Sequence, residues 1–318
     1  IKDYGRNKCK SRTGGNYESL LERKVPKRHK GGCINMDGKT DRWLAWSLLL
    51  LAIGIAVNSI IGPFVSGIVT YPYSDSVRNM TIGLDAVSLI FVAPITVLVA
   101  GYVYRGQQVG YIAAISPSAY AMYTFFQLII GPQYIEYSPV VILHLALFIL
   151  SGFTFVNAWQ RIQVKDLPDF NPRRKKIYAI VLFLLAIFTS LNYIASIPQI
   201  FKGGTIPATY VEDPTVYWSI FLLDLGFVLP ITIAVSVGLL KNRGFAQKAI
   251  YGMVGWYTLV IASVAGMFVA MFLNGDSNVS AEIVLALLSV VLLVVMFSGW
   301  VWQPLIVHRK RTRKDQSE

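Results

Sequence analysis

Residues 283–301 read IVLALLSVVLLVVMFSGWV, an apolar run of membrane-spanning length without a charged residue. A helix of about 20 such residues crosses the hydrocarbon core of a bilayer. Because lipid offers no hydrogen-bond partner to the backbone, such a run predicts a transmembrane helix and not a lone strand. Eight apolar stretches, none with Lys or Arg in its interior, predict an all-α transmembrane fold, an eight-helix bundle with spans at 43–68, 82–104, 109–131, 139–160, 177–199, 217–240, 249–273 and 279–303.

The composition of the 318 residues agrees with this class. Hydrophobic residues make up 54% and charged residues 14%, and the mean hydropathy is +0.53. Soluble domains contain about 25% charged residues. The net charge of +12 does not indicate a nucleic-acid partner, because the basic residues form short blocks between apolar runs. Cys9 and Cys33 lack the spacing of metal ligands, so we expect no metal site and no cofactor.

The distribution of Lys and Arg predicts the orientation in the cell membrane. Of 29 such residues, only Arg78 and Lys202 fall in the loops on one side of the eight predicted spans. Cytoplasmic loops carry the excess of positive charge, so both termini are predicted in the cytoplasm. Tyr and Trp residues near the span ends, among them Tyr71 and Trp300, are typical of interfacial aromatic belts.

The same pattern divides the chain into two four-span halves, a linker and two tails. The four-span halves are residues 43–160 and 177–303, and a basic cytosolic linker, residues 161–176, connects them. The basic cytosolic tails are residues 1–42 and 304–318. We expect the first tail to be disordered and residues 1–35 to lie upstream of the true start at Met36. The basic runs at 173–176 and 308–311 should attract anionic lipid headgroups at the cytosolic face.

Corresponding spans of the two halves resemble each other. The first span contains LLAI at 50–53 followed by Asn58, and the fifth contains LLAI at 184–187 followed by Asn192. Four spans per half make both halves enter the membrane from the same side. The pattern therefore predicts a parallel internal repeat about an axis along the membrane normal.

The second and sixth spans match less closely. The second contains Asp85 and Pro-Ile-Thr at 94–96, and the sixth contains Asp224 and Pro-Ile-Thr at 230–232. The step from Asp to Pro is nine residues in the second span and six in the sixth. The two carboxyl groups therefore need not be equivalent.

These elements also resemble a known family. The family consists of uncharacterised prokaryotic integral membrane proteins of about eight spans, with Gly-x-Asp…Pro and Asp-Leu…Pro motifs. The similar segments lie within residues 80–250 and are GLDAVSL at 83–89 with Pro94, RG at 105–106, YAMY at 120–123, and LDLG at 223–226 with LP at 229–230. The chain departs from the family at 120–123, where an Asn is expected between the tyrosines. The resemblance implies an architecture and no reaction.

Six polar residues inside the predicted spans are the candidate binding residues, because ionisable groups in a membrane are costly and often functional. They are Asp224, Asp85, His144, Glu282, Asn58 and Asn192. All lie in the outer part of their spans, so we expect them to line one cavity open to the outside. We expect Asp224, the deepest, to face the bundle interior near His144, Asn58, Asn192 or a tyrosine hydroxyl.

The alternative interpretation of each residue is structural. The two Asn side chains could join neighbouring helices, Asp85 and Glu282 could be solvated acids near a helix start, and His144 could be a satisfied core histidine. The sequence favours binding or transport of a small solute, an ion or a proton. A membrane-embedded enzyme using His144 with a carboxylate, and a structural or sensory subunit, are the other two hypotheses. The sequence contains no GxSxG, HExxH or Walker motif, and we assign no catalytic residue.

Overall fold

The computed structural model describes residues 38–132, 138–194, 197–198 and 208–315, without the side chains of 38–41, 192, 208–209 and 308–315. The expected disordered tail and the start at Met36 lie outside this part, apart from the last residues of the tail. Residues Asp37–Glu318 form one compact unit. The helices of the first half are α1 (Gly38–Ile61), α2 (Asp75–Val87), η1 (Ser88–Val92), α3 (Ala93–Tyr104), α4 (Gln108–Ile130) and α5 (Val140–Arg161). The linker contains η2 (Val164–Asp166), and the second half contains α6 (Pro172–Ile194), α8 (Ala208–Glu212), α9 (Pro214–Phe221), η3 (Leu222–Val228), α10 (Leu229–Leu240), α11 (Gly244–Leu273) and α12 (Ala281–Asp315).

The helices confirm a multi-pass membrane protein. Seven helical segments of the described residues are long and apolar enough to cross a bilayer, namely Arg42–Ile61, Asp75–Tyr104, Gln108–Ile130, Val140–Arg161, Pro214–Leu240, Gly244–Leu273 and Ala281–Val307. The remaining predicted span, 177–199, begins inside α6, and part of its C-terminal end lies outside the described residues. No strand occurs in the residues described, so the structure is all-α there.

Large apolar side chains cover the outer surface of the bundle. Leu50, Ile149 and Leu285 are 57%, 61% and 64% exposed, and they come from α1, α5 and α12. Water-soluble monomers rarely expose apolar patches of more than a few hundred Å². These side chains are therefore the surface that faces lipid.

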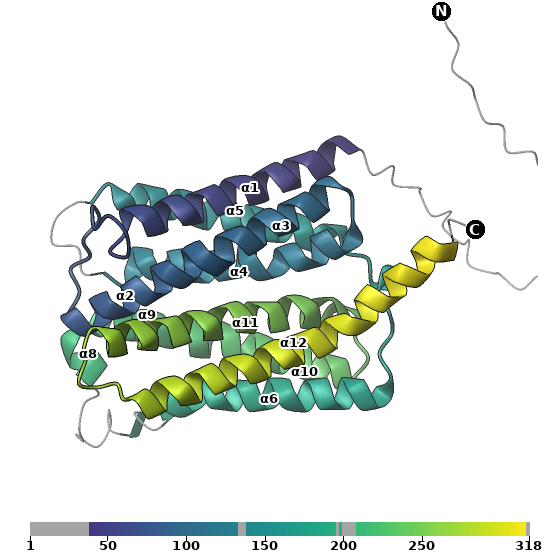
Figure 1. The fold of residues 1–318 in the computed structure, drawn as a ribbon. Helices are drawn as coiled ribbons and strands as arrows, with labels where there is room; N and C mark the ends of the chain where they lie inside the picture. Colours follow the sequence, from purple (N-terminus) through teal and green to yellow (C-terminus); the bar gives the residue numbers. More distant parts are fainter. Residues whose placement is uncertain (1–37, 133–137, 195–196, 199–207, 316–318) are drawn as a thin grey trace, which may run out of the picture. The chain divides into compact units, whose positions relative to one another are not determined.

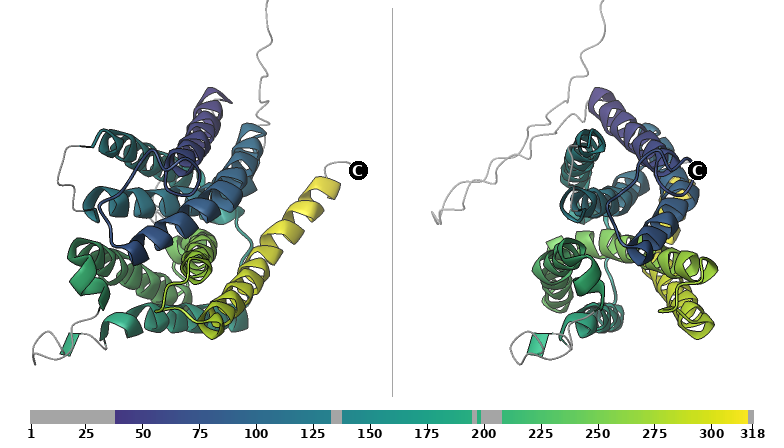
Figure 2. Two further views of the ribbon diagram at one scale, coloured as in Figure 1. Left: turned by 60° about the vertical axis from the view of Figure 1, so that its left-hand side comes forward. Right: turned by 90° about the vertical axis from the view of Figure 1, so that its left-hand side faces the viewer.

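The helices of the first half form a closed set of four neighbours. α1 packs against α3 and α5, and α4 packs against the same two helices. In the second half α10 packs against α6 and α11, and α11 packs against α12. Figures 1 and 2 show α1 to α5 on one side of the unit and α6 to α12 on the other. α11 joins the halves, because it also packs against α2 and α4.

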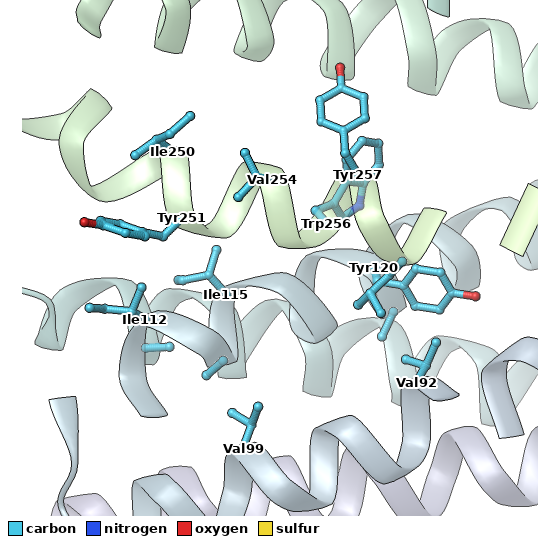
Figure 3. Close-up of a cluster of buried hydrophobic side chains, with 14 of the residues drawn as sticks. Val92, Val99, Ile112, Ile115, Tyr120, Ile250, Tyr251, Val254, Trp256 and Tyr257 are labelled. Atoms are coloured by element: carbon cyan, nitrogen blue, oxygen red, sulfur yellow. The ribbon is translucent and has the colours of Figure 1, made fainter. Parts of the chain in front are cut away.

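Glycines allow α11 to approach the first half closely. A Cβ atom on Gly83 of α2 would lie 2.2 Å from the carbonyl oxygen of Gly266 of α11. Gly252 of α11 packs in the same way on Ile115 of α4, whose Cγ2 atom would lie 2.3 Å from a Cβ. Figure 3 shows the buried apolar side chains of α11, including Tyr251, facing those of α4. Such contacts hold membrane helices together by close packing, since lipid is as apolar as the side chains.

Two spans change from α-helix to π-helix in the middle. η1 joins α2 to α3, and η3 joins α9 to α10, so each pair of α-helices forms one continuous span. In both spans a proline follows the π-helical segment by two residues, Pro94 after Val92 and Pro230 after Val228. A proline lacks the N–H that continues an α-helical ladder, and π-helical turns often mark functional sites.

The same two spans also share their later features. The hydroxyls of Thr96 and Thr232 each donate to the carbonyl oxygen four residues earlier at 2.7 Å. Both spans then end on a residue of left-handed backbone, Gly106 with φ of 64° and Asn242 with φ of 53°. Each of these pairs is separated by 136 residues. Asn is the common substitute for glycine in this conformation, because its short polar side chain tolerates positive φ.

Candidate functional site

A cavity of about 350 Å³ lies between the two halves. Its walls come from α2 and α4 of the first half, and from α6, α9, η3, α11 and α12 of the second. Most of the lining is apolar or aromatic. The polar side chains of the lining are Thr81, Thr124, Gln127, Thr189, Asp224 and Ser263, together with the hydroxyls of Tyr73, Tyr120, Tyr123, Tyr193 and Tyr257.

Asp224 holds the only carboxyl group among the lining residues, and the π-helical segment η3 carries it. The hydroxyl of Tyr123, from α4, donates to its Oδ1 at 2.8 Å. The hydroxyl of Tyr193, from α6, donates to its Oδ2 at 2.8 Å. The prediction that Asp224 faces the interior beside a tyrosine hydroxyl is therefore confirmed. The two tyrosines come from different halves, so this carboxyl joins the halves at the cavity.

Aromatic rings from both halves line the cavity around Asp224. The ring of Tyr123 meets Trp256 edge to face at 5.5 Å, and Trp256 meets Tyr257 in the same way at 5.0 Å. Tyr193 packs edge to face on Phe221 at 5.3 Å. Aromatic faces and a carboxylate both attract a cation, so the walls of this cavity combine two features that bind organic ammonium groups.

A second group of polar side chains lies inside the first half. His144 of α5 is fully buried, and its Nε2 atom lies 2.8 Å from Oδ1 of Asn58 on α1. The hydroxyl of Tyr71 lies 3.3 Å from the same nitrogen. Both of these hydrogen-bond partners are neutral groups. A histidine–carboxylate pair, which the enzyme hypothesis requires, is not observed at His144 among the described residues.

Asp85 lies near this group, and it is 3% exposed. Its carboxyl packs against Gly62 just after the end of α1, where an added Cβ would lie 2.3 Å from Oδ2. The backbone N–H of Phe64 donates to the same carboxyl. The interpretation of Asp85 as a solvated acid near a helix start is wrong, because the side chain is buried ten residues into the α2 span.

The structure brings only some of the six candidates together. Asn58, Asp85 and His144 lie in the first half, and Asp224 lies at the central cavity. Glu282 is exposed in the first turn of α12 and is not part of either group, so the single shared cavity predicted for all six is wrong. The side chain of Asn192, on α6, lies outside the described residues. No group of three or more His, Cys, Asp or Glu residues able to hold a metal occurs in the described part of the chain.

Sequence reasoning expected a tyrosine hydroxyl beside Asp224 but did not identify which tyrosines form the site. Tyr120, Tyr123 and Tyr257 lie well inside their spans, away from the interfaces where tyrosines of membrane proteins usually gather. That position is the signal that could have found them. Tyr71 was expected at an interface, yet it is 7% exposed and bonds His144.

No protein-family model, curated protein or solved structure matches this chain. The motif resemblance described above therefore identifies no family, and the function is argued from the site.

Proposed function

We propose that this protein binds a small organic solute in the cavity beside Asp224 and carries it across the membrane. The observation that carries the proposal is the position of that carboxyl, held by Tyr123 and Tyr193 from the two halves at the wall of a cavity of about 350 Å³. Ligand pockets commonly enclose about 300–1,000 Å³ and combine apolar walls with a few placed polar groups. A carboxyl group shared by two halves is also well placed to respond when the halves move.

The solute class that fits these walls is an organic cation with an apolar body. Asp224 supplies the one negative group of the lining, and the rings of Trp256 and Tyr257 supply cation-attracting faces. The apolar remainder of the lining would cover the body of the solute. A neutral solute of the same shape would leave the carboxyl without a charged partner.

The cavity lies in one half of the membrane-spanning depth. Its lining on α4 runs from Tyr120 to Leu128, near the end of α4, and its lining on α2 runs from Val77 to Leu84, near the start of α2. Toward the opposite ends of α4 and α11, apolar side chains such as Ile112 pack together (Figure 3). This arrangement supports a state in which the cavity faces the outside and the cytoplasmic half is sealed.

Eight spans with both termini in the cytoplasm are part of the proposal. The charge distribution supports it, since Arg78 and Lys202 alone among 29 basic residues fall in the outer loops of that arrangement. Arg78 is also paired with Asp75 at 2.7 Å. The domain limits predicted from the sequence, with halves at 43–160 and 177–303, go with this arrangement.

We also propose the parallel repeat, with a revised alignment. The end of the π-helical segment, the proline, the threonine bond and the left-handed end of the second and sixth spans recur at a constant step of 136 residues. At this step the counterpart of Asp224 is Ser88, and Asp85 has the apolar counterpart Phe221. The alignment supports two halves of common backbone plan that carry different acids.

Contact with anionic lipid headgroups remains a proposal for the exposed basic residues Arg173 and Lys176. Their neighbours have intramolecular partners. Lys175 pairs with Asp169 at 2.8 Å, and Arg174 lies over the ring of Trp300. The side chains of the basic run at 308–311 lie outside the described part of the structure.

Ligand-dependent thermal unfolding of the protein in lipid nanodiscs tests the solute class. Benzylammonium should raise the unfolding temperature of the wild type, and benzyl alcohol, its neutral counterpart of similar size, should not. Asp224→Asn should remove the benzylammonium effect, and the matched control Glu282→Gln, which changes an exposed acid, should retain it. Equal stabilisation of Asp224→Asn and wild type by benzylammonium would show that the cavity does not recognise a cation. Uptake of the same cation into proteoliposomes then tests transport.

A further inference from the structure

A second, much smaller cavity lies inside the first half, where α1 ends against α2 and α4. The cavity has a volume of about 10 Å³, which is room for a single water-sized particle. Its polar lining is made of oxygen-bearing side chains, namely Asn58, Ser59, Asp85, Ser88, Tyr120 and Thr124. The lining contains no Lys, Arg or His.

Two oxygen atoms at this cavity have no hydrogen-bond partner among the described residues. They are Oδ2 of Asp85 and Oγ of Ser59. Asp85 is 3% exposed and Ser59 is fully buried. Buried polar groups in proteins are almost always paired, and each exception requires an explanation. An unpaired carboxylate inside a membrane span requires such an explanation most of all, because neither water nor lipid compensates its charge there.

The surroundings of the cavity favour a positive ligand. The cavity lies at the C-terminal end of α1, which ends at Ile61, and a helix carries partial negative charge at that end. The carboxyl and hydroxyl oxygens of the lining are of the kind that binds hard cations, whereas the amide oxygen of Asn58 is already hydrogen-bonded to His144. One carboxylate neutralises one positive charge, so a monovalent ion leaves no net charge buried whereas a divalent ion would.

We propose that this cavity binds one dehydrated monovalent cation, with Na⁺ the best fit in size, between the Asp85 carboxylate and the Ser59 hydroxyl. The proposed ligand explains both unpartnered oxygens and the oxygen-lined space between α1, α2 and α4. Gly62 lies against the same carboxylate oxygen, and a Cβ there would be 2.3 Å from it.

Hydroxyl groups connect the cation site to the central cavity. Ser88 Oγ lies 3.0 Å from the hydroxyl of Tyr120, and that hydroxyl lies 2.8 Å from Ser263 Oγ on α11. Tyr120 lines both cavities, and Ser263 lines the central one. A cation that takes a lone pair of Ser88 Oγ leaves its proton to point at Tyr120, which then donates to Ser263. This coupling rests on the proposed function, whereas the cation site itself does not.

Thermal unfolding of the full chain in nanodiscs, with Na⁺ exchanged for Cs⁺ at constant ionic strength, tests the site. Cs⁺ is too large for the cavity and serves as the inert cation. The wild type should show a saturable rise in unfolding temperature with Na⁺, on the order of 2–4 °C at saturation. Ser59→Ala, which removes one oxygen and keeps the charge, should lower the apparent Na⁺ affinity at least tenfold. Asp85→Asn should abolish the effect.

The other variants separate this site from the solute site. Glu282→Gln and Asp224→Asn should keep the Na⁺ effect, even where Asp224→Asn has lost the response to benzylammonium. Gly62→Ala should weaken the Na⁺ effect by displacing the Asp85 carboxylate. If Asp85→Asn does not fold, the responses of Gly62→Ala and Ser59→Ala to Na⁺ test the site in its place. The absence of a saturable difference between Na⁺ and Cs⁺ would overturn the proposal. So would a pH dependence of stability that is the same in both salts and disappears in Asp85→Asn, because that result means a protonated carboxyl.

Discussion

Replacing Gly83 with alanine should separate α2 from α11. The new Cβ would lie 2.2 Å from the carbonyl oxygen of Gly266, 2.5 Å from its carbonyl carbon and 2.6 Å from the Cα of Met267. All three atoms belong to the backbone, so no rotamer change relieves the clash. Ordinary contacts of a Cβ begin near 3.4 Å, and the helices must therefore move apart by about 1.2 Å, the difference between 3.4 and 2.2 Å.

The size of the effect follows from two opposing contributions. Overpacking of a closely fitted site costs about 1–3 kcal/mol, and a site walled by backbone belongs at the upper end of that range. Alanine regains about 1 kcal/mol over glycine in a helix. The net loss is therefore about 2 kcal/mol, or a fall of about 3 °C in unfolding temperature for a protein of this size.

Gly101 provides the matched control for Gly83→Ala. It lies in α3 of the same span, and a Cβ there would meet no atom within 4 Å. Gly101→Ala should leave the unfolding temperature unchanged or raise it, because only the gain in helix propensity remains. Unfolding followed by intrinsic tryptophan fluorescence in nanodiscs measures both variants. If Gly83→Ala proves as stable as Gly101→Ala, then α2 and α11 are not packed at these glycines.

Three further outcomes are expected. Asn58→Leu should destabilise the protein by about 1–3 kcal/mol, because it removes a hydrogen-bond partner of the fully buried His144, whereas a stability equal to wild type would mean that water replaces the amide. The pKa of Asp276 is held below its ordinary value of 3.8 by the backbone N–H two residues later and by the Ser76 hydroxyl. The stability from these bonds is present above pH 3.8 and lost as the pH falls through the lowered pKa, so wild type should lose more stability between about pH 5 and pH 3 than Ser76→Ala does. A cysteine placed beside Asp276 should react with an impermeant thiol reagent in intact cells, and one placed in 166–172 should not; the reverse pattern would refute the orientation.

The helices could be predicted from the sequence because each span needs only length and low polarity. The apolar run at 283–301 lies within α12, and the other predicted spans overlap helices of the described part. The boundaries were less accurate, since the predicted span 43–68 extends seven residues past the end of α1 and α2 begins seven residues before the predicted span 82–104. The interior position of Asp224 was predictable for a related reason, since a carboxyl flanked by apolar residues must find polar partners or water.

Partners and helix neighbours were less predictable, because they depend on packing between distant segments. An apolar run does not reveal which of its faces meets protein, so nothing in the sequence of α11 indicated that it joins the two halves. The π-helical segments η1 and η3 have the same apolar composition as the helices around them and give no pattern of their own. The partners of His144 could not be inferred either, since Tyr71 lies 73 residues away and precedes α2 in a loop.

The π-helical segment at Asp224 has a consequence for the evolution of the site. Neighbouring residues of a helix point in directions about 100° apart, so one residue gained or lost turns everything beyond it by that angle. A single-residue deletion inside η3 would leave an unbroken apolar span, yet it would turn α9 against α10 by about 100°. Such a protein would still insert and fold as a helix, but Asp224 would no longer meet the hydroxyls of both Tyr123 and Tyr193. Related proteins that bind a different solute could therefore arise through changes of length at this position, without any change in hydropathy.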